Sequence, residues 1–282
     1  MRLGVVLAVL ALAAGTVVAA ALEASPHVET VLAAGNIATC AGKGDERTAA
    51  IVAREPGTVL TLGNAAYPRG TSLDYARCYG RSWGRFRSRT RPAPGSRDYL
   101  TQEAGPYRSY FGLDRTYDAF DLGSWRLYAL DSENVSSAEL AWLRRDLERQ
   151  PHRCVLAFWD RPRFSSGAHG DQERVRPFWQ LLYAAGAEIV LSGHDADYER
   201  FTRLTPTGDP DWFNGIREFV VGTGGARLSA DVRTDSRTRA VEWWAPGILR
   251  LRLGSRGYSW RFLSAGGPVI DFGGEPCHGE PS

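Results

Sequence analysis

Residues 189–201, IVLSGHDADYERF, are the stretch that decides the fold. Its apolar start, residues 189–191, has the character of a β-strand and ends at Ser192 and Gly193. His194 follows, with three acidic residues in the next five positions. A glycine-ended strand followed by a histidine and carboxylates is typical of a site at the carboxyl edge of an α/β sheet. We therefore expect His194 to belong to a functional cluster at such an edge.

The composition indicates one globular domain. The chain has 282 residues, of which 43% are hydrophobic and 23% charged, so it is long enough and apolar enough to bury a sizeable core. No repeat, charge block or linker divides residues 25–282, and we expect them to form a single unit. The formal net charge of +2 is too small to argue for a nucleic-acid partner.

Residues 1–22 have the composition of an export signal. Arg2 supplies the positive start, residues 3–14 an apolar core, and the alanine-rich end the small residues of a cleavage site. We expect a signal peptide over residues 1–24 and a secreted or cell-envelope protein. The apolar run is close to the ~20 residues that span a bilayer, so an uncleaved anchor is the alternative. Residues 25–282 contain no second membrane span.

Four cysteines, an even number in an exported chain, favour two disulfides over thiol chemistry. Three pairings are open. We favour Cys40 with Cys78, both in the N-terminal half, and Cys154 with Cys277, which would hold the C-terminal tail. The sequence has no C-x-x-C spacing, which argues against a cysteine zinc site.

Hydrophobic patterning gives the expected elements. Glycine-ended apolar runs predict parallel strands, and leucines at helical spacing predict the longest helix, which starts at Ser136 with the form of a capping box. Residues 100–118, rich in Gly, Pro and Tyr, predict a long surface loop. After residue 201, four short runs predict a second, more antiparallel sheet. The expected strands are 31–35, 59–63, 125–130, 154–159, 188–191, 217–222, 247–253, 258–263 and 269–272; the expected helices are 47–54, 74–86, 136–150 and 176–185.

Unusual polar residues follow five strand-like runs. Loops at the carboxyl ends of parallel strands converge in space, so we expect the five to form one cluster, which is the default candidate for an active site. His169 lies in a flexible loop, residues 165–170, between Asp160 and His194 in the sequence. It is either a former substrate contact or a solvated residue. The five loop residues are Asn36, Asn64, Ser96, Asp160 and His194.

In order, spacing and flanking residues, these loops resemble the motifs of calcineurin-like metallophosphoesterases related to purple acid phosphatases, of a secreted bacterial type. The resemblance covers roughly residues 31–225. It implies an α/β fold of two mixed β-sheets packed face to face and flanked by helices. The matching motifs are Gly35-Asn36, Gly63-Asn64-Ala65, Gly95-Ser96-Arg97-Asp98, Trp159-Asp160-Arg161-Pro162 and Gly193-His194-Asp195-Ala196.

The family hydrolyses phosphoric esters with two metal ions, such as Fe, Zn or Mn, held about 4 Å apart by carboxylate, amide and imidazole ligands. Position by position, five of the six ligands that the resemblance implies are replaced here. Asn36 and Asn64 stand for two aspartates, the second of them bridging, Ser96 for an asparagine, and Asp160 and Ala196 for histidines; only His194 is kept, and Arg97 replaces the proton-donating histidine.

These replacements predict a protein without its dinuclear metal site. A neutral amide at Asn64 cannot offset the repulsion of two dications, and Ala196 offers no ligand atom. We expect no bound metal, or at most one weakly held ion at Asp160 and His194 with Asn36 and Asn64. The alternative interpretation of His194 is a hydrogen-bonded remnant, and of Asp160 an ion pair with Arg97 or Arg161.

The function expected from the sequence is therefore that of a secreted, catalytically inactive phosphoesterase-like protein. Arg97, Arg161 and Arg163 are candidate contacts to a phosphorylated small molecule or protein. Two alternatives stay open: a phosphomonoester hydrolase with weak activity from a single metal ion, and a structural protein of the cell envelope.

Overall fold

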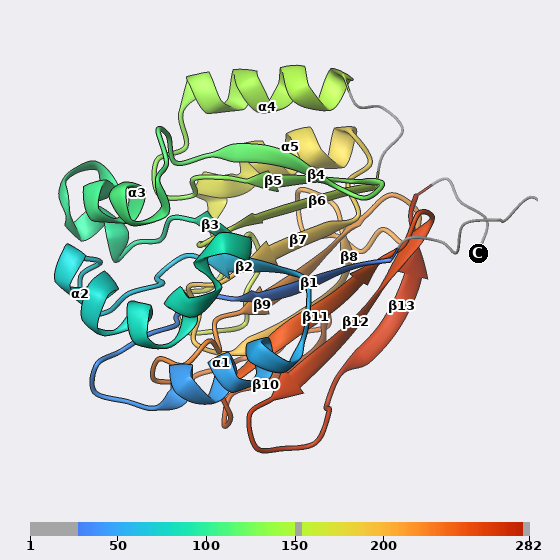
Figure 1. Cartoon of the computed structure of the whole chain (residues 1–282). Helices are drawn as coiled ribbons and strands as arrows, with labels where there is room; N and C mark the ends of the chain where they lie inside the picture. Colours follow the sequence, from blue (N-terminus) through green and yellow to red (C-terminus); the bar gives the residue numbers. More distant parts are fainter. Residues whose placement is uncertain (1–27, 150–153, 279–282) are drawn as a thin grey trace, which may run out of the picture.

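Two β-sheets packed face to face form the centre of the computed structural model, which describes residues 28–149 and 154–278 (Figure 1). The predicted signal at residues 1–24 lies outside the described residues. The first sheet has the strand order β13-β12-β11-β1-β2-β3. Its strands are β1 (Glu29–Ala34), β2 (Thr58–Leu62), β3 (Thr90–Ala93), β11 (Gly247–Leu253), β12 (Gly257–Ser264) and β13 (Phe272–Pro276).

The second sheet has the order β10-β8-β9-β7-β6-β5-β4. Both sheets are mixed. In the first sheet β1, β2 and β3 run parallel, and in the second β5, β6, β7 and β9 do. The remaining neighbours pair antiparallel. The strands of the second sheet are β4 (Asp118–Leu122), β5 (Trp125–Ala129), β6 (Cys154–Trp159), β7 (Ile189–Ser192), β8 (Tyr198–Leu204), β9 (Ile216–Val221) and β10 (Thr238–Glu242).

Helices cover the outer faces of the two sheets. Helix α1 (Gly44–Arg54) packs Ala49 and Val52 into the core cluster of the first sheet. Helices α4 (Ser137–Arg149) and α5 (Arg176–Ala184) pack Leu143 and Leu182 onto the second. Two short helices, α2 (Ser72–Arg77) and α3 (Gly105–Phe111), lie at one end. The expected α/β fold of two mixed sheets with flanking helices is confirmed.

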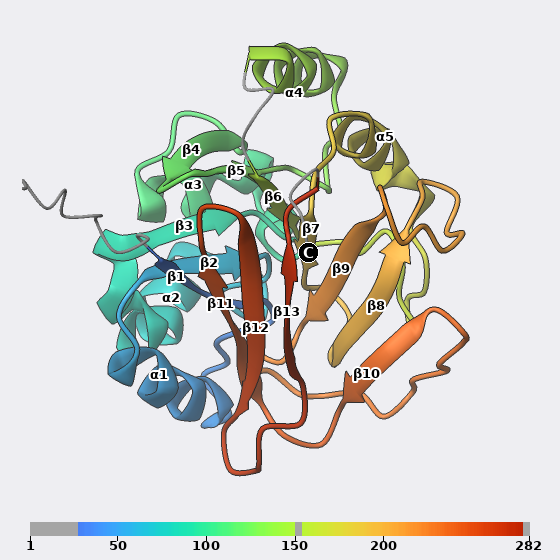
Figure 2. The same ribbon diagram turned by 90° about the vertical axis from the view of Figure 1, so that its right-hand side faces the viewer.

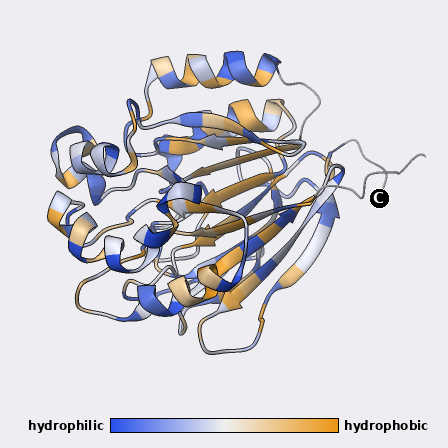
Figure 3. Cartoon of the chain, in the orientation of Figure 1, coloured by the Kyte–Doolittle hydropathy of each residue, from blue (hydrophilic) through white to orange (hydrophobic). Residues whose placement is uncertain are grey.

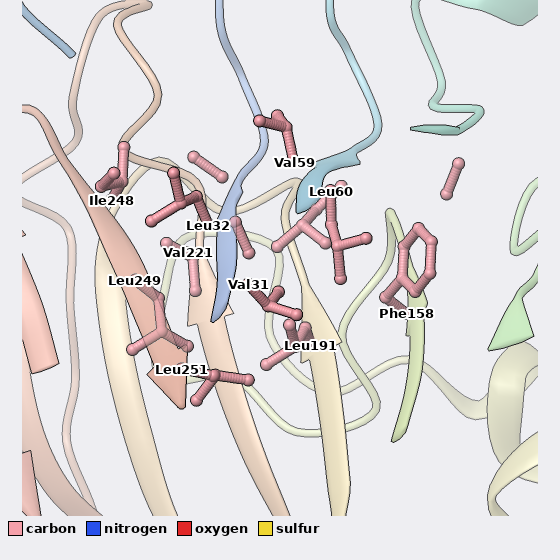
Figure 4. Packing of buried hydrophobic residues seen from close by; sticks show 14 of the residues in the cluster. Val31, Leu32, Val59, Leu60, Phe158, Leu191, Val221, Ile248, Leu249 and Leu251 are labelled. Carbon is pink, nitrogen blue, oxygen red and sulfur yellow. The ribbon is translucent and has the colours of Figure 1, made fainter. Parts of the chain in front are cut away.

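The main core lies between the two sheets. Figure 4 shows Val31 and Leu249 of the first sheet beside Leu191 and Val221 of the second, and all four are fully buried. Strands β6 and β9 are buried along their whole length. Burial on both faces explains why β6 is a continuous apolar run and not an alternating one. In Figure 3 the inner strands are mainly hydrophobic, whereas the outer helices carry hydrophilic surfaces.

Both favoured disulfides are confirmed. Cys40 pairs with Cys78, with their Cα atoms 4.8 Å apart. Cys154 pairs with Cys277 at 5.9 Å and so fixes the end of β13 to the start of β6. Figure 2 views the molecule from the side on which β12 and β13 lie. Among the described residues, no helix combines the length and the apolar character that crossing a membrane would require.

Four of the expectations about elements are wrong. The strand expected over residues 269–272 is displaced, because β13 begins only at Phe272. The C-terminal strands do not form a separate sheet: β9 and β10 complete the second sheet, and β11, β12 and β13 complete the first. Residues 100–118 are not a plain loop, because they contain α3, whose Tyr107 is fully buried. The helix expected over residues 74–86 is broken into α2 and two 3₁₀ segments, since Tyr75 and Tyr79 turn inward to pack against Phe111.

The capping box at the start of α4 is only half formed. Ser136 Oγ accepts a hydrogen bond from the backbone N–H of Glu139, as expected. The Glu139 carboxylate, however, accepts from the backbone N–H of Asp131 and does not return to the cap residue. A contact with the end of β5 has therefore replaced the local one.

Candidate functional site

The five polar loop residues meet at the carboxyl ends of the parallel strands. Asn36 and Asn64 follow β1 and β2 in the first sheet, Asp160 and His194 follow β6 and β7 in the second, and Ser96 follows β3. Hydrogen bonds join them across the gap between the two sheets. We call Asn36, Asn64, Asp160 and His194 the strand-end cluster.

The backbone at three of these positions is left-handed. Asn36 and Asn64 each have φ 51° and His194 has φ 62°, and each follows a glycine. Asparagine tolerates this conformation better than most residues, because its short amide bonds locally. Gly63 has no space for a side chain, since a Cβ there would collide with the carboxylate of Asp160. The glycine thus lets the two sheets bring their polar loops into contact.

Both the oxygen and the nitrogen of the Asn64 side-chain amide form hydrogen bonds. Its Oδ1 accepts from the backbone N–H of Arg97 at 2.8 Å and from Ser96 Oγ at 3.3 Å, which fixes the amide orientation. Its Nδ2 therefore donates to Asn36 Oδ1 at 3.2 Å and to Asp160 Oδ1 at 3.1 Å. At this position a metal-bridging carboxylate would direct an oxygen toward two cations. The Asn64 amide instead directs an N–H group toward the oxygens of Asn36 and Asp160.

Asn36 is held in the same manner. Its Nδ2 donates to the backbone carbonyl of His194 at 2.9 Å, and its Oδ1 accepts from the hydroxyl of Tyr67 at 2.8 Å. Tyr67 was not singled out by the sequence, although it lies in the loop after β2. Burial, followed by the charge of Asp160, raises the pKa of Tyr67, so its hydroxyl keeps the proton that it donates.

Asp160 is fully buried and is satisfied without an arginine. Besides Asn64, it accepts from the backbone N–H of Ser96 at 3.1 Å and from His194 Nδ1 at 3.1 Å. The expected ion pair between Asp160 and Arg97 or Arg161 is absent from the described contacts. For His194, the structure places the ring in a hydrogen-bonded setting with only 7% of its side chain exposed.

Arg161 lies on the other side of the His194 ring. Its Nη1 is 3.1 Å from His194 Nε2, and its Nε donates to Glu133 Oε1 at 2.6 Å. Because a guanidinium can only donate, Nε2 is the acceptor and the ring proton lies on Nδ1, where it bonds Asp160. A fixed cation therefore bridges the two groups, Glu133 and His194, that a metal ion would have to join.

Glu133 is a member of this site that sequence reasoning missed. Its carboxylate, that of Asp160 and the His194 ring offer ligand atoms within 4.8 Å of one another. Burial, followed by the charge of Asp160, raises the pKa of Glu133, while the hydrogen bond from Arg161 opposes that rise. The available signal was its place just after β5, at the same sheet edge as the other loops.

The residues present do not fit a dinuclear metal centre. Asn36 and Asn64 carry no charge, and their polar atoms are already bonded to one another and to neighbours. Ala196 follows in the loop after β7 and supplies no ligand. The only three-ligand group at this site, Glu133 with Asp160 and His194, is bridged by Arg161.

The three candidate phosphate contacts are separated by the structure. Arg97 is exposed, and its guanidinium lies over the Tyr67 ring at 5.5 Å. Arg161 is committed to Glu133 and His194. Arg163 has a side chain only 3% exposed that bonds the carbonyl of Pro206 and pairs with Glu173. The expectation that Arg163 lines the site is wrong, because the residue turns into the second sheet's own packing.

His169 stands at the rim of the strand-end cluster. Its ring centroid is 4.4 Å from that of His194. Its Nδ1 is 2.6 Å from a carboxylate oxygen of Asp195, which also accepts from the His169 backbone N–H at 3.0 Å. With 55% of its side chain exposed, His169 is accessible to solvent, whereas His194 beneath it is only 7% exposed.

Searches with the sequence and with the structure give different results. Neither a family model nor a curated protein matches the sequence. Among solved structures, GAP50, the anchor in the inner membrane complex of Plasmodium, aligns with a TM-score of 0.71 and 15% identity over 89% of each chain. Purple acid phosphatase PPD1 from yellow lupin (Lupinus luteus) aligns with a TM-score of 0.68 and 15% identity, over 90% of this chain.

This chain spans 55% of the lupin enzyme's length. PhoD aligns less closely, with a TM-score of 0.59 and 12% identity, over 88% of this chain and 68% of that one. Identities this low establish similarity of fold and nothing finer. The order of strands, the convergence of the loops and these neighbours agree: the chain has the fold of the calcineurin-like phosphoesterases.

Proposed function

We propose that this chain is an exported member of the calcineurin-like phosphoesterase superfamily that has no catalytic metal centre and acts as a binding scaffold. One observation carries the proposal: the side chains at the ligand positions are bonded to one another. Asn64 donates into the oxygens of Asn36 and Asp160, and Arg161 joins Glu133 to His194. A metal ion would have to break these bonds before it gained its own.

Two further observations support the proposal. Both disulfides suit an oxidising compartment, in line with export. GAP50, the structural neighbour with the highest of the three TM-scores, is named for a role as an anchor. For a phosphorylated partner, Arg97 is the one predicted contact at the rim whose guanidinium has no carboxylate partner among the described residues.

The test is the metal content of the purified, tag-free protein, combined with hydrolysis of 4-nitrophenyl phosphate. Iron, zinc and manganese well below one ion per chain, without metal-dependent hydrolysis, is the expected result. About two ions per chain together with hydrolysis would overturn the proposal, because ligands other than those described here would then complete the site.

The second candidate function is weak hydrolysis by a single ion, favoured by the proximity of Glu133, Asp160 and His194. The metal content of the natural chain separates the candidates, because single-ion hydrolysis requires about one bound ion per chain there. Arg161→Ala tests whether the arginine is what keeps an ion out. If the three groups form a latent site blocked only by the arginine, this variant takes up about one zinc ion per chain. Arg97→Ala is the matched control, because it removes a cation from the rim that bonds none of the three groups.

A further inference from the structure

A hollow lies away from the strand-end cluster, between the free edges of the two sheets. Its volume is about 510 Å³, within the roughly 300–1,000 Å³ of ordinary ligand pockets. Residues of β3, β4 and the segment after α3 line it, and Figures 1 and 2 both show these elements together at one corner. We call it the arginine pocket, after Arg87, Arg91 and Arg115.

Two of the three arginines lack a counter-charge. Arg115 pairs with Asp118 at 3.3 Å, and that carboxylate is the only acidic group in the lining. Arg87 and Arg91 form no ion pair or side-chain hydrogen bond with any described residue. Three guanidinium groups and one carboxylate leave an excess of two positive charges around one hollow. An arrangement of this kind selects an anion.

Each guanidinium is also placed against an aromatic ring. Arg87 lies over Tyr110 at 5.2 Å, Arg91 over Phe120 at 5.4 Å and Arg115 over Tyr117 at 4.9 Å. Such stacking limits how far a long side chain can move, so less freedom is lost when its donors bind a ligand. The pocket thus has cationic groups that are held in place before any ligand arrives.

The remaining lining is apolar. Phe111, Leu113 and Phe120 supply hydrophobic surface beside the charges. A bare inorganic ion would leave this surface in contact with water, whereas a ligand with an apolar body would cover it. An added peptide strand suits the edge poorly, since Pro92 of β3 has no N–H to donate.

We propose that the arginine pocket binds a small organic anion, a carboxylate or phosphate carried on an apolar, preferably aromatic, body. The head group is held by Arg87 and Arg91, with Arg115 at the rim, and the body packs on Phe111 and Phe120. This site is independent of the strand-end cluster and of whether that cluster holds metal.

Calorimetric titration of the full chain with four probes tests the proposal. Phenyl phosphate and 3-phenylpropionate share an aromatic body and differ in the head group, so they separate the two sources of charge. Benzyl alcohol lacks the charge, and inorganic phosphate lacks the body. At least one aromatic anion should bind about tenfold or more tightly than either control probe. Equal binding of inorganic phosphate and phenyl phosphate would overturn the role of the apolar wall.

Arginine substitutions test whether the anion binds in the arginine pocket. Arg87→Ala combined with Arg91→Ala is expected to weaken binding of the aromatic anion by about tenfold or more. Arg54→Ala combined with Arg77→Ala is the matched control, since it removes the same charge from exposed positions outside the pocket. Arg97→Ala, at the strand-end cluster, should leave this binding unchanged. Loss of binding with Arg97→Ala alone, or no binding of either anion at millimolar concentration, would overturn the proposal.

Discussion

Two polar clusters meet in the loop after β7, where His194 of the strand-end cluster directly precedes Asp195, and they have opposite electrostatic designs. In the strand-end cluster, Asn64 and Asp160 are buried and their polar atoms are bonded. The acidic cluster, which we define as Asp195, Asp197 and Glu199, is equally buried, but neither carboxylate oxygen of Asp197 has a partner. The first cluster satisfies its polar groups with hydrogen bonds, and the second must hold some of its carboxyls in the protonated form.

The difference shows in the pKa values. Burial, followed by the charges of Glu199 and Asp195, raises the pKa of Asp197 to about 9. Glu199 accepts hydrogen bonds from Ser165 and Ser166, which oppose the rise that burial causes in its pKa. Uncharged amides, as at Asn36 and Asn64, avoid this kind of strain. A buried polar cluster built from amides can therefore stabilise a fold where clustered carboxylates would not.

The largest expected effect comes from breaking the strand-end cluster at its centre. Asn64→Ala leaves Asp160, Asn36 and the Arg97 backbone N–H each short of a partner in a buried place. We expect a loss of about 2–4 kcal/mol in the free energy of unfolding, measured by urea denaturation. Asn134→Ala, at an exposed position, should change it by less than about 0.5 kcal/mol. A comparable loss in both variants would contradict the cooperative role of Asn64.

The second prediction concerns pH and the acidic cluster. In the unfolded chain Asp197 loses its proton near its ordinary pKa of 3.8, whereas in the folded protein it keeps it up to about 9. The folded state binds more protons between these values, so stability is greatest at low pH and falls as pH rises toward 9. The expected loss from Asp197 is about 2.7 kcal/mol from pH 6 to pH 8, since one such group contributes about 1.36 kcal/mol per pH unit.

Asp197→Asn cannot ionise and should lose markedly less stability over the same interval, again measured by urea denaturation. Four other buried carboxyls titrate in both proteins and contribute to the remaining slope: burial raises the pKa of Asp98 and Glu188 to about 7, and that of Glu139 and Glu218 to about 8. If the variant and the natural chain lose stability equally between pH 6 and pH 8, Asp197 is already ionised in the fold and the contrast between the clusters fails.

The smallest of the three expected effects comes from replacing Arg161, whose guanidinium bridges Glu133 and His194. Arg161→Gln leaves Glu133, only 9% exposed, without its strongest partner. We expect a loss of about 1–2 kcal/mol, because the pair is partly screened by solvent. Adding Glu133→Gln should restore part of the loss, and a double-mutant cycle measures the coupling. Strictly additive losses would show that Arg161 acts through packing and not through the bridge.

Much of the candidate site was predictable. The strand ends, the convergence of the strand-end cluster and the presence of two disulfides follow from local patterns: glycine after an apolar run, and an even number of cysteines without metal-site spacing. Glu133 and Tyr67 were missed, because neither residue type is unusual at the end of a strand. Arg163 was misplaced, because the sequence does not show toward which side a loop arginine turns.

By itself, the sequence determined which chemical groups the site can offer to a ligand. Amides at Asn36 and Asn64 and a methyl group at Ala196 cannot supply the charge that two cations need, in whatever fold they stand. Only the tertiary structure decided which polar groups form hydrogen bonds with one another and which elements lie side by side. Arg161 reaches His194, the C-terminal strands divide between two sheets, and three arginines gather around one hollow. These outcomes depend on contacts between residues distant in the chain, and local hydrophobic patterning carries no information about such contacts.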